Sequence, residues 1–238
     1  MAFFVRTTKE VVDHCINSTP PGQLPSMITH LQSLIPDTMT RELAEGAAFE
    51  YNKTHARVAS VADGRKLVYC DTAVIDKHFF LDPKTNSVFK INHLTMEAEI
   101  SSSHQPPVKK QFEPYRVAVE STLEGYVKKR FPSPKTAWAV YATSGGLIVQ
   151  IVVENLNERN MWAGLWDSRW VLVMKDGKSA DVEGHIRVHA HYHEGRLKST
   201  LSPFVFMINC IRCKHSIEDI EDYSFEENIH GKNRRRVT

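Results

Sequence analysis

Hydrophobic positions in the first 55 residues recur at helical spacing. Thr7-Thr-Lys-Glu10 has the pattern of a capping box, and Pro25 lies in the first turn of a second segment. The repeating apolar positions are Val12, Cys15 and Ile16, then Leu24, Met27, Ile28, Leu31, Leu34 and Ile35, then Met39, Leu43, Ala47 and Tyr51. Because tight turns join these three stripes, residues 1–55 are predicted to form an antiparallel helix bundle.

Hydrophobic residues alternate with a period of two after residue 56. Residues 57–61 and 66–70 flank Asp63-Gly64, which predicts a β-hairpin. Residues 74–81 and 87–91 predict two more short strands. Residues 97–111 are rich in Ser, Pro and charge, which is typical of a surface loop. We therefore expect a small β region with a surface loop over residues 56–111.

A longer helix and a series of strands follow. Pro114 begins the helix, and Pro132 marks its end. The predicted strands are 138–143, 147–154, a tryptophan-rich strand within 160–174, 182–193 and 196–201. Short turns between them predict a five-stranded antiparallel meander, so the fold class is α+β. This helix and sheet occupy residues 112–203, and a divergent tail occupies 204–238.

Three tryptophans spaced four residues apart mark the middle strand of this sheet. Trp162, Trp166 and Trp170 would share one face, with Gly164 and Ser168 between the large rings. A single strand over 160–174 would span about 50 Å, so a bend or bulge is expected near Gly164 or Asp167. Few helices follow to cover three indoles. Because a large uncovered apolar face marks a partner site, we expect another chain to complete this sheet.

Alternating histidines define the next strand and raise the question of a metal. His185, His189, His191 and His193 share one face, and Tyr192 lies on the other. Imidazoles two residues apart can share zinc, which makes a metal-binding enzyme on this strand an alternative. No carboxylate or cysteine with ligand spacing lies nearby in sequence. The simpler interpretation is a solvated or partner-facing surface, with no metal and no cofactor.

Other motifs add little chemistry. Cys210-Ile-Arg-Cys213-Lys-His215 is only half of a zinc site. Asp13-His14-Cys15 combines catalytic residue types, but helix neighbours point about 100° apart and do not face one another. Ser144-Gly-Gly146 lacks the spacing and the lysine of a phosphate-binding loop. Arg234-Arg-Arg236 is either a basic patch or a solvated end. The pattern favours a binding module and not an enzyme.

Composition indicates the class of protein and the cellular compartment to which that module belongs. The chain has 238 residues, 42% hydrophobic and 24% charged, which is ordinary for a globular protein. The formal net charge is +2, which gives no general case for nucleic acid. No apolar run approaches the ~18 residues of a membrane span. Four cysteines form no disulfide framework in a chain of this length, so a reduced cytoplasmic location is expected.

Several ordered blocks resemble the alpha subunit family of the heterodimeric F-actin capping protein. The tryptophan block, which runs from Asn160 to Trp170, is the closest match. The other blocks are Pro20-Pro-Gly22, Glu45–Ala48 with Tyr51-Asn52, Phe80-Leu-Asp-Pro83 through His93-Leu94, and Val188–Glu194 with His191-Tyr192. Together they cover about residues 10 to 202 in the family's order.

The resemblance implies an obligate partner. An alpha and a beta subunit of this family share one fold, join strands in one antiparallel sheet and bind the barbed end of actin filaments without calcium. Trp162, Trp166, Trp170, His191 and Tyr192 are then candidates for subunit-interface or sheet-landmark positions. The resemblance fades near Ser202, so no actin-contact residues can be assigned. This difference leads to the alternative hypothesis of a truncated form that pairs with the beta subunit but caps poorly. The expected location is the cytoplasmic actin cytoskeleton.

Overall fold

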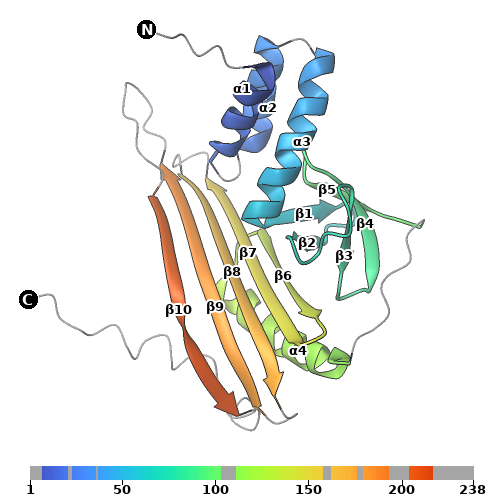
Figure 1. Ribbon diagram of the computed structural model, residues 1–238, viewed down its shortest axis with the longest axis vertical. Helices are drawn as coiled ribbons and strands as arrows, with labels where there is room; N and C mark the ends of the chain where they lie inside the picture. Colours follow the sequence, from blue (N-terminus) through green and yellow to red (C-terminus); the bar gives the residue numbers. More distant parts are fainter. Residues whose placement is uncertain are drawn as a thin grey trace, which may run out of the picture.

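A computed structural model places four helices and two β-sheets in a mixed α+β fold, as expected (Figure 1). The structure describes residues 7–20, 23–35, 37–102, 111–157, 162–175, 179–192 and 204–216. Within these ranges the side chains of 37–40, 156–157, 162–163, 190–192 and 204–216 are outside the description. The fold class is therefore confirmed at the level of its elements.

The first three helices pack on one another around a small core. They are α1 (Thr8–Asn17), α2 (Leu24–Leu34) and α3 (Asp37–His55). The predicted capping box is present, because the Thr7 hydroxyl accepts from the amide of Glu10, whose carboxylate accepts from the amide of Thr7. Most of the predicted stripe residues enter the core, although Leu34 is exposed. The core contains Val12, Ile16, Leu24, Ile28, Leu31, Ala44, Ala47, Ala48 and Tyr51.

The small sheet has five strands in the order β2-β1-β5-β4-β3. They are β1 (Arg57–Val61), β2 (Lys66–Tyr69), β3 (Phe79–Asp82), β4 (Ser87–Asn92) and β5 (Glu97–Ile100). The hairpin of β1 and β2 is confirmed.

Two expectations for the small sheet were wrong. β5 forms where a surface loop was expected, because its backbone pairs with β1 and β4 although only Ala98 is buried on it. The strand predicted to begin at Val74 begins instead at Phe79, because the Asp76 carboxylate accepts from the amides of His78 and Phe79 in a turn. Residues 103–110 of the predicted loop lie outside the described residues.

The large sheet is a sequential antiparallel meander in the order β10-β9-β8-β7-β6. Its strands are β6 (Lys135–Ala142), β7 (Gly146–Asn157), β8 (Trp162–Lys175), β9 (Ser179–Tyr192) and β10 (Phe204–Ser216). The fifth strand is β10, in the region expected to be a tail. The strand predicted at 196–201 lies outside the described residues.

The bulge expected in the tryptophan strand is absent from β8. Its register with β7 runs without a shift from Trp162 to Val173, and its register with β9 runs from Trp162 to Lys175. A long strand is stable here because both neighbours are long and pair with it throughout. The register shift lies instead in β10, between Cys210 and Cys213.

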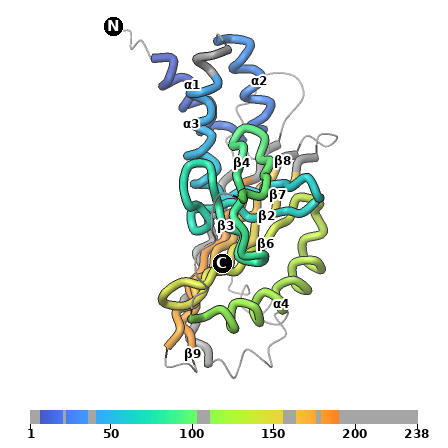
Figure 2. Tube along the Cα trace, turned by 90° about the vertical axis from the view of Figure 1, so that its right-hand side faces the viewer, coloured from blue at the N-terminus to red at the C-terminus, as the bar shows by residue number. Residues whose placement is uncertain are grey.

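Different layers cover the two faces of the large sheet (Figure 2). Helix α4 (Glu113–Arg130) packs on β6 and β7 through Leu123 and Val127, and we call this the α4 face. Alternate residues on the opposite face, including Ala137, Tyr141 and Val152, join the core of the small sheet, and we call this the junction face. Alternation along each strand thus assigns every described side chain of the large sheet to one of the two faces.

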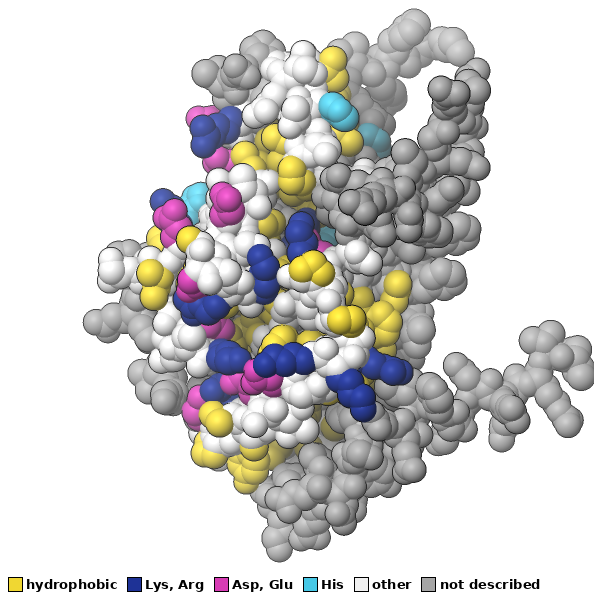
Figure 3. Space-filling view, turned by 180° about the vertical axis from the view of Figure 1, so that it is seen from behind, with side chains coloured by type: hydrophobic (Ala, Val, Ile, Leu, Met, Phe, Trp, Pro, Cys, Tyr) yellow, Lys and Arg dark blue, Asp and Glu magenta, His cyan; other side chains and the backbone are white. Residues whose placement is uncertain are grey.

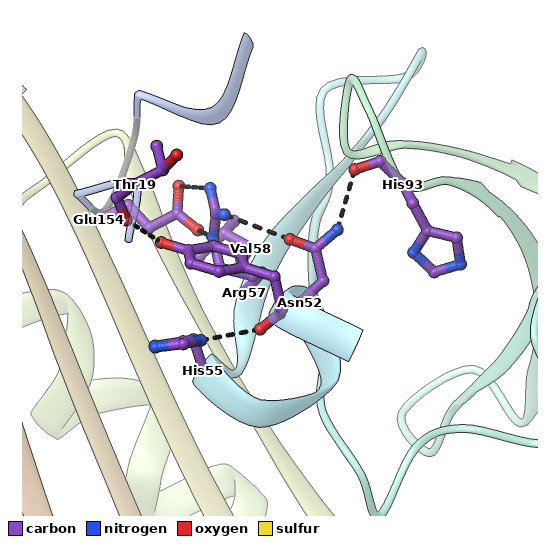
Figure 4. Close-up of polar contacts among 8 residues, drawn as sticks. Thr19, Asn52, His55, Arg57, Val58, His93 and Glu154 are labelled. Atoms are coloured by element: carbon purple, nitrogen blue, oxygen red, sulfur yellow. Dashed lines mark hydrogen bonds and ion pairs between the residues drawn. The ribbon is translucent and has the colours of Figure 1, made fainter. Parts of the chain in front are cut away.

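A buried ion pair fastens the helices and the small sheet to the junction face (Figure 4). Arg57 Nε lies 2.6 Å from Glu154 Oε1, and Nη2 lies 3.2 Å from Oε2. Burial opposes ionisation of Glu154, but the Arg57 guanidinium and the Val58 amide outweigh it and lower its pKa. Asn52 links the pair to the small sheet, because it accepts from Arg57 and donates to the His93 carbonyl.

Candidate partner surface on the large sheet

The tryptophans lie on the α4 face, at the border of the area that the helix covers. Trp166 is opposite Val153 on β7 and Val188 on β9, and Trp170 is opposite Val149 and Gly184. Both indoles pack against the core under α4 and both stay partly exposed. Their shared orientation, predicted from the spacing of four, is confirmed. Trp162 occupies the same face by register, but its side chain is outside the description.

Trp166 is fixed by aromatic packing without a polar contact. Its ring lies 5.5 Å from that of Phe131, the residue that follows α4, with 47° between the planes. Its Nε1 is buried, and no described residue accepts a hydrogen bond from it. A buried indole N–H usually finds an acceptor, so Trp166 Nε1, like Trp138 Nε1, departs from that rule within the described residues.

Trp170 lies across Gly184 on the neighbouring strand. A Cβ added at Gly184 would come under 3.0 Å from three atoms of the Trp170 ring, including Cε3 and Cδ2. A Cβ added at Gly164 would meet only the His189 carbonyl oxygen, at 3.5 Å. The glycine that makes room for an indole is therefore Gly184, across the sheet, and not Gly164 within the tryptophan block.

Half-buried apolar residues continue this surface beyond α4. Val182, Ile186 and Val188 of β9 are partly exposed and follow Leu172 and Trp170 toward β10. Figure 3 shows the molecule from the side opposite to that in Figure 1, and hydrophobic side chains lie there beside Lys and Arg side chains. β10 is the last strand of the large sheet. It pairs with β9 on one side, and no other described strand pairs with its outer edge. An apolar face and an adjacent sheet edge therefore lie together.

The predicted histidine cluster is only partly described and is not a metal site there. His185 and His189 lie on the junction face, while the side chains of His191 and Tyr192 are outside the description and His193 is outside the described residues. His189 contacts His55 of α3, with 5.6 Å between the rings. Burial and the charges of His55 and Arg187 lower the pKa of His189 to about 4. Among the described residues no group of three His, Cys, Asp or Glu could hold a metal.

The remaining sequence candidates have ordinary structural roles where they are described. Asp13 pairs with Lys9 one turn earlier in α1, as expected of helix residues. Gly146 follows Gly145 at the turn into β7 with a φ of +151°, and any Cβ there would collide with Leu172 of β8. The side chains of Cys210, Cys213 and His215 are outside the description, and 234–236 lie outside the described residues.

Comparison with known proteins identifies what this sheet belongs to. The model of the F-actin capping protein alpha subunit family matches residues 12–196. The chain belongs to this family. The matched range includes the small sheet, the tryptophan strand and most of the large sheet, so the resemblance found in the sequence blocks is confirmed.

Individual capping protein alpha subunits show the same relationship. The one from Neurospora crassa is 26% identical over 193 residues, covering 78% of this chain and 67% of the relative. The one from Debaryomyces hansenii is 24% identical over 244 residues, covering 95% of this chain and 86% of the relative. The solved structure of a homodimeric actin capping protein alpha subunit from Plasmodium berghei has a TM-score of 0.73 at 21% identity, covering 87% of this chain and 78% of that chain, which shows a shared fold.

Proposed function

We propose that this chain is the alpha subunit of a two-chain protein that caps the barbed ends of actin filaments. In this role it blocks subunit addition and loss at the fast-growing end without calcium, in the cytoplasmic actin cytoskeleton. The observation that carries the proposal is the family match over residues 12–196, on a chain whose large sheet has the family's tryptophan strand. No helix within the described residues is long and apolar enough to cross a membrane.

The proposed interface with a beta subunit combines the β10 edge and the α4 face. An exposed edge offers unpaired N–H and C=O groups to a partner strand, and β10 lies at the end of its sheet. The half-buried Trp166 and Trp170 lie on the α4 face of the same sheet, with the Trp162 and Tyr192 positions toward one end of β8 and β9, whereas the His191 position alternates to the junction face. A partner that extends the sheet from β10 and also lays a segment over the α4 face would bury the tryptophans as well. The resulting interface would combine backbone pairing with apolar contact.

A second candidate partner is another copy of the same chain. The solved relative from Plasmodium berghei is described as homodimeric, and it shares this fold. Antiparallel pairing of two β10 edges satisfies a two-fold axis, because each strand then presents the same groups to the other. This alternative changes the partner and retains the same surface.

Two measurements test these proposals together. The chain is co-expressed with a beta subunit and also alone, and the molar mass of each purified species is measured by light scattering. Elongation from labelled filament seeds is then followed with and without calcium. A 1:1 complex that stops barbed-end growth equally in both conditions is the expected result. A stable complex that leaves elongation unchanged would refute capping and favour the poorly capping form, while a homodimer would favour self-pairing.

A further inference from the structure

A polar cavity of about 410 Å³ lies on the junction face, where three parts of the fold meet. The end of α3 contributes Glu50, Lys53 and Thr54, and the segment after β2 contributes Asp71. Strands β8 and β9 form the floor with Arg169, His185 and Arg187, next to Asp167. The partner surface proposed above is the opposite α4 face together with the β10 edge, so this cavity is a separate feature.

Arg187 is a charged group in this cavity with a buried donor that has no described partner. Its Nη1 donates to the Thr54 carbonyl at the end of α3, at 3.1 Å. Its Nε is buried and has no hydrogen-bond partner among the described residues. Asp167 is directly opposite on β8, yet no ion pair joins the two in the described part of the chain. A guanidinium fork is thus held in place with part of its donor capacity unused.

Three carboxylates line the cavity; Glu50 comes from α3, and the other two, Asp71 and Asp167, are engaged with other groups. Asp71 Oδ1 lies 2.5 Å from Arg169 Nη1 and also accepts from Thr72. Asp167 accepts from the side-chain amide of Gln150 and is almost fully buried. Burial raises the pKa of Asp167 to about 6, against the opposing effects of Arg187 and Gln150. Neither carboxylate therefore satisfies the free side of Arg187.

We propose that this cavity binds a small phosphate-type oxyanion, held by Arg187 and flanked by Arg169, with Lys53 at the rim. Arginine matches phosphate oxygens through parallel N–H donors, and here the cations come from α3, β8 and β9. A tetrahedral anion accepts from several directions at once, which suits this arrangement better than a planar carboxylate. The volume exceeds that of one phosphate, so the phosphate of a small metabolite also fits. Such a ligand would tie the end of α3 to the sheet.

Binding is tested by calorimetric titration of the purified complex at constant ionic strength. Inorganic phosphate and glycerol 3-phosphate are compared with chloride, which distinguishes a free ion from an esterified phosphate. Arg187→Gln should weaken binding about 10- to 100-fold, because a charge-assisted hydrogen bond is lost. Arg65→Gln is the matched control, since Arg65 pairs with Asp63 on the exposed hairpin, and it should bind like wild type.

Asp167→Asn keeps the proposal falsifiable if Arg187→Gln does not fold. It preserves the side-chain shape and removes a negative charge beside Arg187, so phosphate should bind about 3- to 10-fold more tightly at pH 7.5. The proposal is overturned if the wild-type protein binds neither probe at about 10 mM, a concentration that would detect even a site with a millimolar Kd. Unchanged affinity in Arg187→Gln would do the same. Because the readout is binding and not elongation, failure here leaves the capping proposal intact.

Discussion

The contact between Trp170 and Gly184 gives a sharp test of how the tryptophan strand is packed. Gly184→Ala places a methyl group under 3.0 Å from the indole, so the ring or the strand has to move. Overpacking of this kind costs about 1–3 kcal/mol, and the reduced freedom of the unfolded chain offsets about 0.4–1 kcal/mol. The net expectation is a destabilisation of about 0–2.6 kcal/mol. For a chain of this size each kcal/mol lowers Tm by about 2–4 °C.

Gly164→Ala is the matched control, because it makes the same chemical change on the adjacent strand. Its added methyl group meets only the His189 carbonyl oxygen at 3.5 Å, an ordinary contact. Gly164→Ala should therefore be neutral or stabilise by up to about 1 kcal/mol. Chemical denaturation of the purified complex measures both variants.

A double-mutant cycle identifies the indole as the cause of the effect. In a Trp170→Leu background the smaller side chain leaves space at Gly184, so Gly184→Ala should lose most of its cost. Equal destabilisation by Gly184→Ala in the two backgrounds would refute this explanation. So would a Gly184→Ala variant that unfolds like wild type while Gly164→Ala is destabilised.

Three further substitutions test the layers on both faces. Arg57→Ala should lower the free energy of unfolding by about 3–5 kcal/mol in urea denaturation at pH 7, because it leaves Glu154 buried without its cation. Adding Glu154→Gln to this variant should restore part of the lost stability, and no restoration would contradict the ion-pair explanation. Asp167→Asn should stabilise by up to about 2–3 kcal/mol at pH 7.5, because the folded-state pKa of about 6 exceeds the ordinary 3.8 and disfavours the carboxylate. That gain should vanish as pH falls from 6 to below 4, and a gain independent of pH would exclude this cause. Trp166→Ala should cost roughly 3 kcal/mol through cavity formation beside Phe131, and melting like wild type would show that the indole is not packed.

Local pattern was sufficient to predict the helices and most of the strands. The capping box at Thr7 and Pro25 near the start of α2 act within one turn, so the sequence carries the whole signal. Strands with a nearly continuous apolar run, such as β7, were predicted for the same reason. β5 was missed because its stability comes from backbone pairing with β1 and β4, and its Glu-Ala-Glu-Ile sequence has only two alternating apolar residues, of which only Ala98 is buried. The absent bulge in β8 also depends on neighbours, because only long flanking strands allow a straight strand of that length.

The candidate site shows the same division between local and distant information. The spacing of the tryptophans predicted their common face, but the role of Gly184 appears only in the β8–β9 register, which brings it opposite Trp170. The sequence contains one sign of the buried ion pair, because the carboxylate of Glu154 follows the apolar run of β7. The partner of Glu154 is Arg57, which lies 97 residues earlier, at the start of the small sheet. Sequence spacing alone cannot make that assignment.

Polar groups on the junction face explain why this interface is specific as well as stable. Buried Arg57 and Glu154 are paired, and the pKa of Glu154 is lowered, so a placement of β1 against β7 that separated them would leave a buried charge unpaired. Asp167 on the same face has a raised pKa and a single amide donor in Gln150, so its burial costs stability at neutral pH. A fold that needed only stability would replace Asp167 with an apolar residue, as its neighbour Leu165 shows is possible there. The Asp167 carboxyl borders the cavity opposite Arg187 on the neighbouring strand, and its negative charge offsets part of the charge of that guanidinium.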